Sequence, residues 1–208
     1  MPVTVKELFN AFNLKVEVPL KFGTLTKKDL HESHGVYVIE IPKKMSAPNF
    51  KEDLLKAWFE KSGRVNIKGK DANVKTVTDE LNKFWHKDET IIYIGQTSKS
   101  VEGLKKRLND FRLHKPGNKG SHAGGYWSKL LDKWENFNVH YAIVEDQNIR
   151  DLEFKMLMYF VMKTANEKNI FKIENIGNYL PFANLTADFD TPHSISGAIK
   201  EKNKKQKN

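Results

Sequence analysis

The chain has 208 residues, of which 39% are hydrophobic and 29% are charged, and its 35 lysine and arginine residues exceed its 26 acidic residues by nine. This length and apolar content suffice for one or two globular domains with a hydrophobic core. The chain has no cysteine, which excludes a disulfide scaffold, a thiolate zinc site, an iron–sulfur cluster and a cysteine nucleophile.

The sequence shows no signal for a membrane or for export. No stretch approaches the roughly 20 consecutive apolar residues of a membrane span. The N-terminal segment 1–13 alternates polar and apolar side chains and lacks the apolar core of a signal peptide. Together with the absence of cysteine, these features predict a soluble, unprocessed protein of the cytoplasm.

Hydrophobic periodicity predicts helices alternating with three short strands. In chain order we expect a helix at 4–13, an extended segment at 16–20, a strand at 35–41, helices at 50–60 and 75–86 around a loop at 63–69, a strand at 91–95, a turn at 96–100, a helix at 101–113, a loop at 116–125, a short helix at 126–133, a strand at 137–144 and a helix at 150–167. The strand at 35–41 is apolar on both alternating faces, which is typical of a central strand, and the last helix is apolar almost all round, which predicts burial. The pattern favours a single α/β, more specifically α+β, domain with a folded insertion.

The excess positive charge is concentrated in two segments. One is the helix and loop at 105–119, where apolar residues are interleaved with the cations, so the charges decorate a folded element. The other is the tail at 200–208, which has no apolar residue and is expected to be disordered. If the partner is a nucleic acid, its phosphates are expected to contact the cations of the first segment, Lys105, Lys106, Arg112, Lys115 and Lys119.

Two tripeptides, Gly35-Val36-Tyr37 and Tyr93-Ile94-Gly95, lie on the first two predicted strands and resemble the motifs of the GIY-YIG nuclease family. The pieces that follow appear in the family's order: a helix with Leu104-Lys105-Lys106-Arg107-Leu108, a third strand, a helix with Glu153 in its first turn, and a late Leu180-Pro181-Phe182-Ala183-Asn184 segment. The resemblance implies a three-stranded GIY-YIG-type sheet flanked by helices. The domain would span 35–184 with an insertion at 43–90, between an N-terminal extension at 1–34 and a C-terminal extension at 185–208.

The resemblance further implies a DNA endonuclease that hydrolyses phosphodiester bonds with one divalent metal ion, Mg²⁺ or Mn²⁺. Family members that act in homing or repair usually add separate DNA-binding domains, for which this chain has no room. We therefore expect a stand-alone, restriction-type enzyme on double-stranded DNA. The insertion, the loop at 115–125 and the termini would then select the target.

The site residues follow from the same resemblance. Tyr37 and Tyr93 would line the site, one orienting or deprotonating the water and the other positioning the phosphate. Arg107 would bind the phosphate, since a guanidinium stays charged and can bind two phosphate oxygens, with Arg112 as the alternative. Glu153 is also indicated by its own helix, because its neighbours at i+3, i+4 and i+7 are apolar and an unpaired charge there is costly. It is the expected metal ligand.

The chain departs from the family at Phe111, where a His or Tyr often shuttles protons. Either His114 or His122 is expected to replace it, and Asn184 to orient a phosphate or water. If the geometry follows the family, Tyr37 and Tyr93 should face a solvent-accessible cleft shared with Arg107 and Glu153. If the structure instead buries both tyrosines, or places Glu153 on the far side of the sheet, the nuclease interpretation fails even if the fold is right.

Two other functions remain open. Phe111 favours a non-catalytic nucleic-acid-binding module that retains the fold, whereas Glu153 on an apolar helix face favours an enzyme. A structural adaptor would instead bind a protein through the aromatic residues of the insertion, Trp58, Phe59, Phe84 and Trp85. The alternative role for these aromatics is to pack the insertion onto the core.

Overall fold

The computed structural model describes residues 2–62, 65–67, 70–97, 102–114, 124–145, 148–184 and 195–196. The expected turn at 96–100 is described only at 96–97, which belong to a strand and not to a turn. Most of the expected loop at 116–125 and the whole basic tail at 200–208 lie outside these ranges. Within them the chain is a mixed α+β structure, as predicted. No helix among the described residues is long and apolar enough to cross a bilayer.

The main sheet is antiparallel and has the strand order β1-β6-β2-β5. Its strands are β1 (Leu20–Lys21), β2 (Gly35–Glu40), β5 (Ile91–Thr97) and β6 (Asn138–Ile143). The three predicted strands are therefore present, with β2 in the centre. The predicted three-stranded sheet is nevertheless wrong by one strand, because the end of the expected extended segment pairs with β6 as Leu20 opposite Val139.

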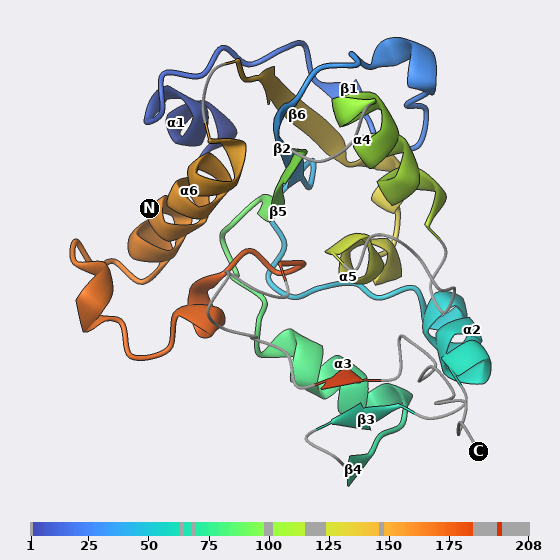
Figure 1. Ribbon diagram of the computed structural model, residues 1–208. Coiled ribbons are helices and arrows are strands. Elements are labelled where there is room, and N and C mark those ends of the chain that lie inside the picture. The colour runs from blue at the N-terminus through green and yellow to red at the C-terminus, as the bar shows by residue number, and fades with distance from the viewer. Residues whose placement is uncertain are drawn as a thin grey trace, which may run out of the picture.

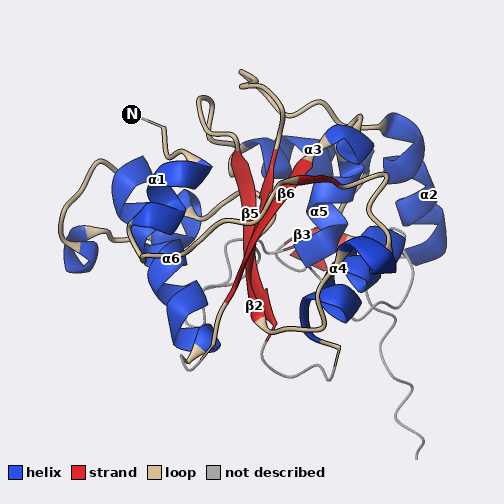
Figure 2. Cartoon of the chain, turned by 90° about the horizontal axis from the view of Figure 1, so that it is seen from above, coloured by secondary structure: helices blue, strands red, loops and turns tan. Residues whose placement is uncertain are grey.

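The two faces of the sheet carry separate hydrophobic clusters, because successive side chains of a strand point to opposite faces. Val36 and Val38 of β2 contribute to one cluster. Helices α1 (Val5–Asn10) and α6 (Ile149–Thr164) cover this face. Tyr37 and Ile39 of the same strand belong to the other cluster, which is covered by α4 (Gly103–Leu113) and α5 (Gly124–Leu130) (Figure 2). Each fully buried aliphatic side chain contributes about 1.5–3 kcal/mol.

Helix α6 begins and ends for local reasons. The side chain of Asn148 accepts a hydrogen bond from the backbone N–H of Asp151 at 3.3 Å and caps its first turn. Asn166 has a φ of 53° and so stops the helix three residues before the predicted end. Met156 and Phe160 are fully buried, which confirms the predicted burial of this helix.

The insertion contains α2 (Glu52–Ser62), α3 (Val74–Asn82) and part of a second sheet, at the bottom of Figure 1. That sheet has the order β4-β3-β7 and comprises β3 (Asn66–Ile67), β4 (Lys70–Asp71) and β7 (Ile195–Ser196). The expected loop at 63–69 thus includes a strand. Short 3₁₀ turns complete the described structure at Lys27–Asp29, Trp134–Asn136, Ile170–Lys172 and Ile176–Tyr179.

Aromatic side chains fix the insertion to the rest of the molecule. Trp58 is fully buried and meets Trp127 of α5 edge to face, with ring centroids 5.5 Å apart. Trp85 meets Phe182 in the same way at 5.2 Å. These contacts show that Trp58 and Trp85 pack the insertion onto the core, which removes the main support for an adaptor surface.

Candidate active site

Tyr37 and Tyr93 lie side by side on the α4 face of the sheet. Their rings stack with centroids 5.8 Å apart and an interplanar angle of 30°. The hydroxyl of Tyr37 shares side-chain hydrogen bonds with the hydroxyl of Tyr93 and with the guanidinium of Arg107, which donates. The two predicted strands therefore bring both tyrosines to one place.

Gly95 makes this arrangement possible. It is the register partner of Tyr37 on the neighbouring strand. A Cβ atom at this position would lie 2.6 Å from Cζ and 2.7 Å from the hydroxyl oxygen of Tyr37, and 2.5 Å from Cε1 of Tyr93. These separations are too short for any carbon, so the two rings occupy the space that a side chain at position 95 needs.

Helix α4 carries Arg107 and is fixed at its start by the preceding loop. The first backbone N–H groups of the helix donate to carbonyls of that loop, Leu104 to Ser33 at 2.8 Å and Lys105 to His31 at 3.0 Å. Gly103 adopts a φ of 49° at the turn into the helix, and a Cβ there would collide with the Ser33 carbonyl. The helix N-terminus is therefore already satisfied.

Lys129 holds the other end of α4, a role that the sequence did not reveal because a lysine in a helix normally predicts exposure. It is only 3% exposed. Its ammonium donates to the carbonyl of Arg112 and, at 2.6 Å, to that of His114, the last carbonyls of α4. It also lies 4.5 Å from the centroid of the Trp134 ring.

Glu153 stands in the first turns of α6, and its predicted apolar surroundings are confirmed. Met156, Leu157 and Phe160 are all buried. Helix α6 packs on the face of the sheet opposite to α4, and a Glu153 on the far side of the sheet was a stated ground for rejecting a nuclease. The charge of Glu153 nevertheless acts on Tyr37 and Tyr93, because it raises the pKa of both hydroxyls.

The four groups are electrostatically coupled. Burial raises the pKa of Tyr37 to about 12, against the lowering influence of Arg107 and with a further contribution from Glu153. Burial also raises the pKa of Tyr93 well above its usual value. Burial disfavours the charged form of Arg107, but the neighbouring Tyr37, Tyr93 and Glu153 outweigh this and raise the pKa of its guanidinium.

The predicted open cleft is wrong. Tyr37 is fully buried and Tyr93 is 7% exposed. Part of the reason is Phe111, which is fully buried with its ring centroid 6.4 Å from that of Tyr37 and 5.3 Å from that of Tyr93. The position at which the family often has a proton-carrying side chain thus holds an apolar ring against both tyrosines.

The two histidines proposed as proton shuttles have different outcomes. His114 is buried at the end of α4, and burial together with the nearby charge of Lys129 lowers the pKa of its imidazole. It is therefore neutral at pH 7. His122 lies outside the described residues.

Several of the predicted DNA-binding cations are engaged within the protein. Lys105 pairs with Glu32 at 2.5 Å, and Lys106 pairs with Asp110 at 3.1 Å. A guanidinium nitrogen of Arg112 donates to the side-chain oxygen of Asn109 at 3.2 Å. Lys115 and Lys119 lie outside the described residues.

Asn184 braces the strand that carries Tyr93. Its side-chain oxygen accepts a hydrogen bond from the backbone N–H of Ile94 at 2.9 Å, and its side-chain nitrogen donates to the carbonyl of the same residue at 2.8 Å. Both atoms of the amide are therefore occupied by the backbone. The expectation that Asn184 orients a phosphate or water is replaced by a structural role.

The donor set for a metal is small. Among the residues that the structure describes, no group of three or more histidine, aspartate or glutamate side chains could hold an ion. Mg²⁺ commonly binds proteins through one or two carboxylates and takes its other ligands from water and substrate phosphates. A single Glu153 fits an ion that binds together with substrate, but it does not make a preformed metal site.

Comparisons with models of protein families, with curated proteins and with solved structures find no match to this chain. The chemistry of the site is therefore inferred from its own residues.

Proposed function

We propose that the protein is a divalent-metal-dependent DNA endonuclease of the GIY-YIG type. The observation that supports this is that Tyr37 forms side-chain hydrogen bonds with Tyr93 and Arg107 and that the charge of Glu153 acts on all three. These residues are successively 56, 14 and 46 positions apart in the sequence. Local sequence patterns alone do not require them to meet.

Each group has a chemical task in phosphodiester hydrolysis. Arg107 places a permanent positive charge beside the tyrosine hydroxyls, where it can bind the non-bridging phosphate oxygens and stabilise the charge of the transition state. Glu153 would hold Mg²⁺ or Mn²⁺ together with the substrate phosphate. The ion would supply positive charge at the departing oxygen and lower the pKa of bound water. The tyrosine hydroxyls would orient the attacking water.

The burial of both tyrosines meets a ground stated above for rejecting a nuclease, so this proposal requires that the site open when DNA binds. A hydroxyl with a pKa of about 12 does not act as a general base near pH 7. Burial is the main cause of the raised pKa, so an opening that admits water and DNA would lower it. The closed arrangement would then be the resting state of the enzyme, and DNA binding would expose Tyr37 and Tyr93.

A second candidate is the non-catalytic nucleic-acid-binding module. Two observations favour it: both tyrosines are buried, and Phe111 packs against them. In this case the polar group of Tyr37, Arg107 and Glu153 would hold the fold together, and DNA would bind elsewhere on the surface.

A cleavage assay decides between the two candidates. Purified protein is incubated with plasmid and branched DNA in Mg²⁺, Mn²⁺ or EDTA. We expect cleavage with either metal and none with EDTA. Absence of cleavage on every substrate, with DNA binding retained, would favour the non-catalytic module.

The variant Glu153→Gln tests the assignment of the site. We expect cleavage to fall by at least about a hundredfold because the expected metal ligand is lost, with little change in DNA affinity or thermal stability. Asp151→Asn is the matched control, since Asp151 lies on the same helix but is exposed and pairs with Lys155 at 2.6 Å. Unchanged cleavage by Glu153→Gln contradicts the site.

A further inference from the structure

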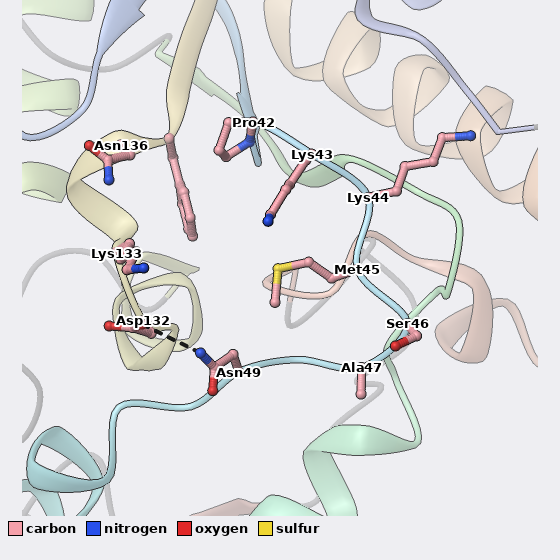
Figure 3. Close-up of a pocket in the computed structure, with 11 residues that line it drawn as sticks. Pro42, Lys43, Lys44, Met45, Ser46, Ala47, Asn49, Asp132, Lys133 and Asn136 are labelled. Carbon is pink, nitrogen blue, oxygen red and sulfur yellow. Dashed lines mark hydrogen bonds between the residues drawn. The ribbon is translucent and has the colours of Figure 1, made fainter.

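A pocket of about 460 Å³ lies just after the end of β2, and neither Tyr37 nor Tyr93 lines it (Figure 3). Its volume lies within the range of ligand sites. One wall is the segment that begins the insertion, and the other is the turn between α5 and β6. The lining residues are Pro42, Lys43, Lys44, Met45, Ser46, Ala47, Asn49, Asp132, Lys133, Asn136 and Phe137.

The two walls are tied together, so the pocket is formed in advance of any ligand. Phe50 and Leu131 form an antiparallel bridge. On either side of it, the N–H of Lys51 donates to the carbonyl of Leu130 and the N–H of Asp132 donates to that of Asn49, both at 2.7 Å. A ligand here would not need to order the two segments first.

The pocket is built for an anion. Three lysines line it against one aspartate, and the carboxylate of Asp132 accepts a hydrogen bond from the side chain of Asn49 at 3.4 Å. Figure 3 shows the ammonium of Lys43 directed into the pocket and that of Lys44 directed away. Among the described residues, neither Lys43 nor Lys133 has an ion-pair partner.

The backbone at Lys133 is an independent sign that this side chain is needed. Three non-glycine residues of the described chain have a positive φ. Two of them, Asn13 and Asn166, are of the type that tolerates the left-handed region, whereas Lys133, with a φ of 56°, is not. Strained conformations of this kind cluster at functional sites.

The opposite part of the lining is apolar, from Pro42, Met45 and Phe137. We propose that the pocket binds one nucleotide of a DNA strand, with its phosphate on Lys43 and Lys133 and its base or sugar against the apolar wall. This inference deepens the proposed function and rests on it. Neither Tyr37 nor Tyr93 lines the pocket, so it would hold a nucleotide other than the one at the cleaved bond and help select the substrate.

The test combines Lys43→Gln with Lys133→Asn, each also made singly, and measures binding of a fluorescent duplex oligonucleotide over a range of salt concentrations. The measurements use the Glu153→Gln background, which prevents cleavage. We expect the double variant to bind about tenfold more weakly and to lose about one unit of the log–log salt slope, because one phosphate contact is removed. Lys44→Gln, from the same wall, should bind within about twofold of the parent.

Thermal unfolding separates a binding defect from a folding defect. Asparagine tolerates the left-handed region better than lysine, so Lys133→Asn should raise the melting temperature while it weakens DNA binding. A lower melting temperature together with unchanged binding contradicts the role of Lys133.

Three further outcomes test the nucleotide pocket and the nuclease separately. DNA binding of the double variant equal to that of the parent overturns the nucleotide pocket, even if the wild type cleaves DNA. Binding of free dAMP as tight as that of the duplex also overturns it, in favour of a free-nucleotide site. A wild type that binds DNA through Lys43 and Lys133 but cleaves nothing leaves the pocket intact and refutes the nuclease.

Discussion

Gly95 sets how closely the two tyrosines approach. The rings of Tyr37 and Tyr93 occupy the volume that any side chain at this position would need. Gly95 of the second tripeptide therefore leaves the space that Tyr37 of the first tripeptide needs, since the two residues are register partners on neighbouring strands. Because Tyr37 bonds to both Tyr93 and the half-buried Arg107, a displacement of its ring would change both hydrogen bonds.

The variant Gly95→Ala should displace these rings. We expect a loss of about 1–3 kcal/mol in the free energy of unfolding, the usual cost of overpacking a filled site. Urea unfolding measures the loss. A variant as stable as the wild type would show that Tyr37 and Tyr93 can move without cost.

Alkaline titration tests the burial of Tyr37. Its pKa is raised to about 12 in the folded protein, against about 10 for an ordinary tyrosine. The stability that comes from keeping the proton is fully present below pH 10 and is lost as the pH rises toward 12. We expect the phenolate absorbance of Tyr37 to appear late, together with unfolding, and Tyr37→Phe to remove one late-titrating group.

The resemblance to the family, and not the periodicity of the elements, led us to expect Tyr37, Tyr93, Arg107 and Glu153 close together, and their charges do act on one another in the structure. The sequence could not show that the site is closed. The site is closed because Phe111 of α4 contacts both tyrosines. The periodicity of a helix predicts which of its faces is buried, but not which strand residues that face contacts.

At the scale of elements, the predictions succeeded where a periodic pattern was long enough. The strands at 35–41, 91–95 and 137–144 were recognised, whereas β1, β3, β4 and β7 were not. Each of these four has only two residues, too few for an alternating pattern to be distinguished from a loop. Their pairing is decided by distant partners.

The contact between Lys129 of α5 and the end of α4 can be tested. Lys129 of α5 bonds to the last carbonyls of α4, so Lys129→Met should leave them without a donor. We expect a loss of about 1–3 kcal/mol in stability, the cost of unsatisfied buried groups, and a further loss of cleavage if α4 shifts Arg107. Hydrogen exchange of the α4 amides measures the first effect, and unchanged exchange would contradict the capping role.

At the scale of the whole molecule, the positive charge is not all available to a polyanion. Lys105 and Lys106 neutralise acidic neighbours, while Lys43 and Lys133 line an open pocket. Which lysines are paired depends on the tertiary structure, so the clustering of charge in the sequence does not by itself show which cations have acidic partners.

Deletion of the tail at 200–208 tests how much of the DNA binding comes from the charge of the tail. We expect cleavage to be retained and the salt dependence of DNA binding to become at most somewhat shallower, since the tail could add only non-specific phosphate contacts. Cleavage and fluorescence anisotropy measure the two effects. Complete loss of activity after the deletion would instead assign the tail an essential role.

The bracing of β5 by Asn184 has a consequence for self-association. Strand β5 lies at the end of the sheet order, where free N–H and C=O groups could recruit a strand of another molecule. The amide of Asn184 occupies both backbone groups of Ile94, and the N–H of Ala183 donates to the carbonyl of Ile92 at 2.8 Å. Asn184 and Ala183 thus occupy three backbone groups on the edge of the strand that carries Tyr93, so fewer groups remain there to pair with a strand of another molecule.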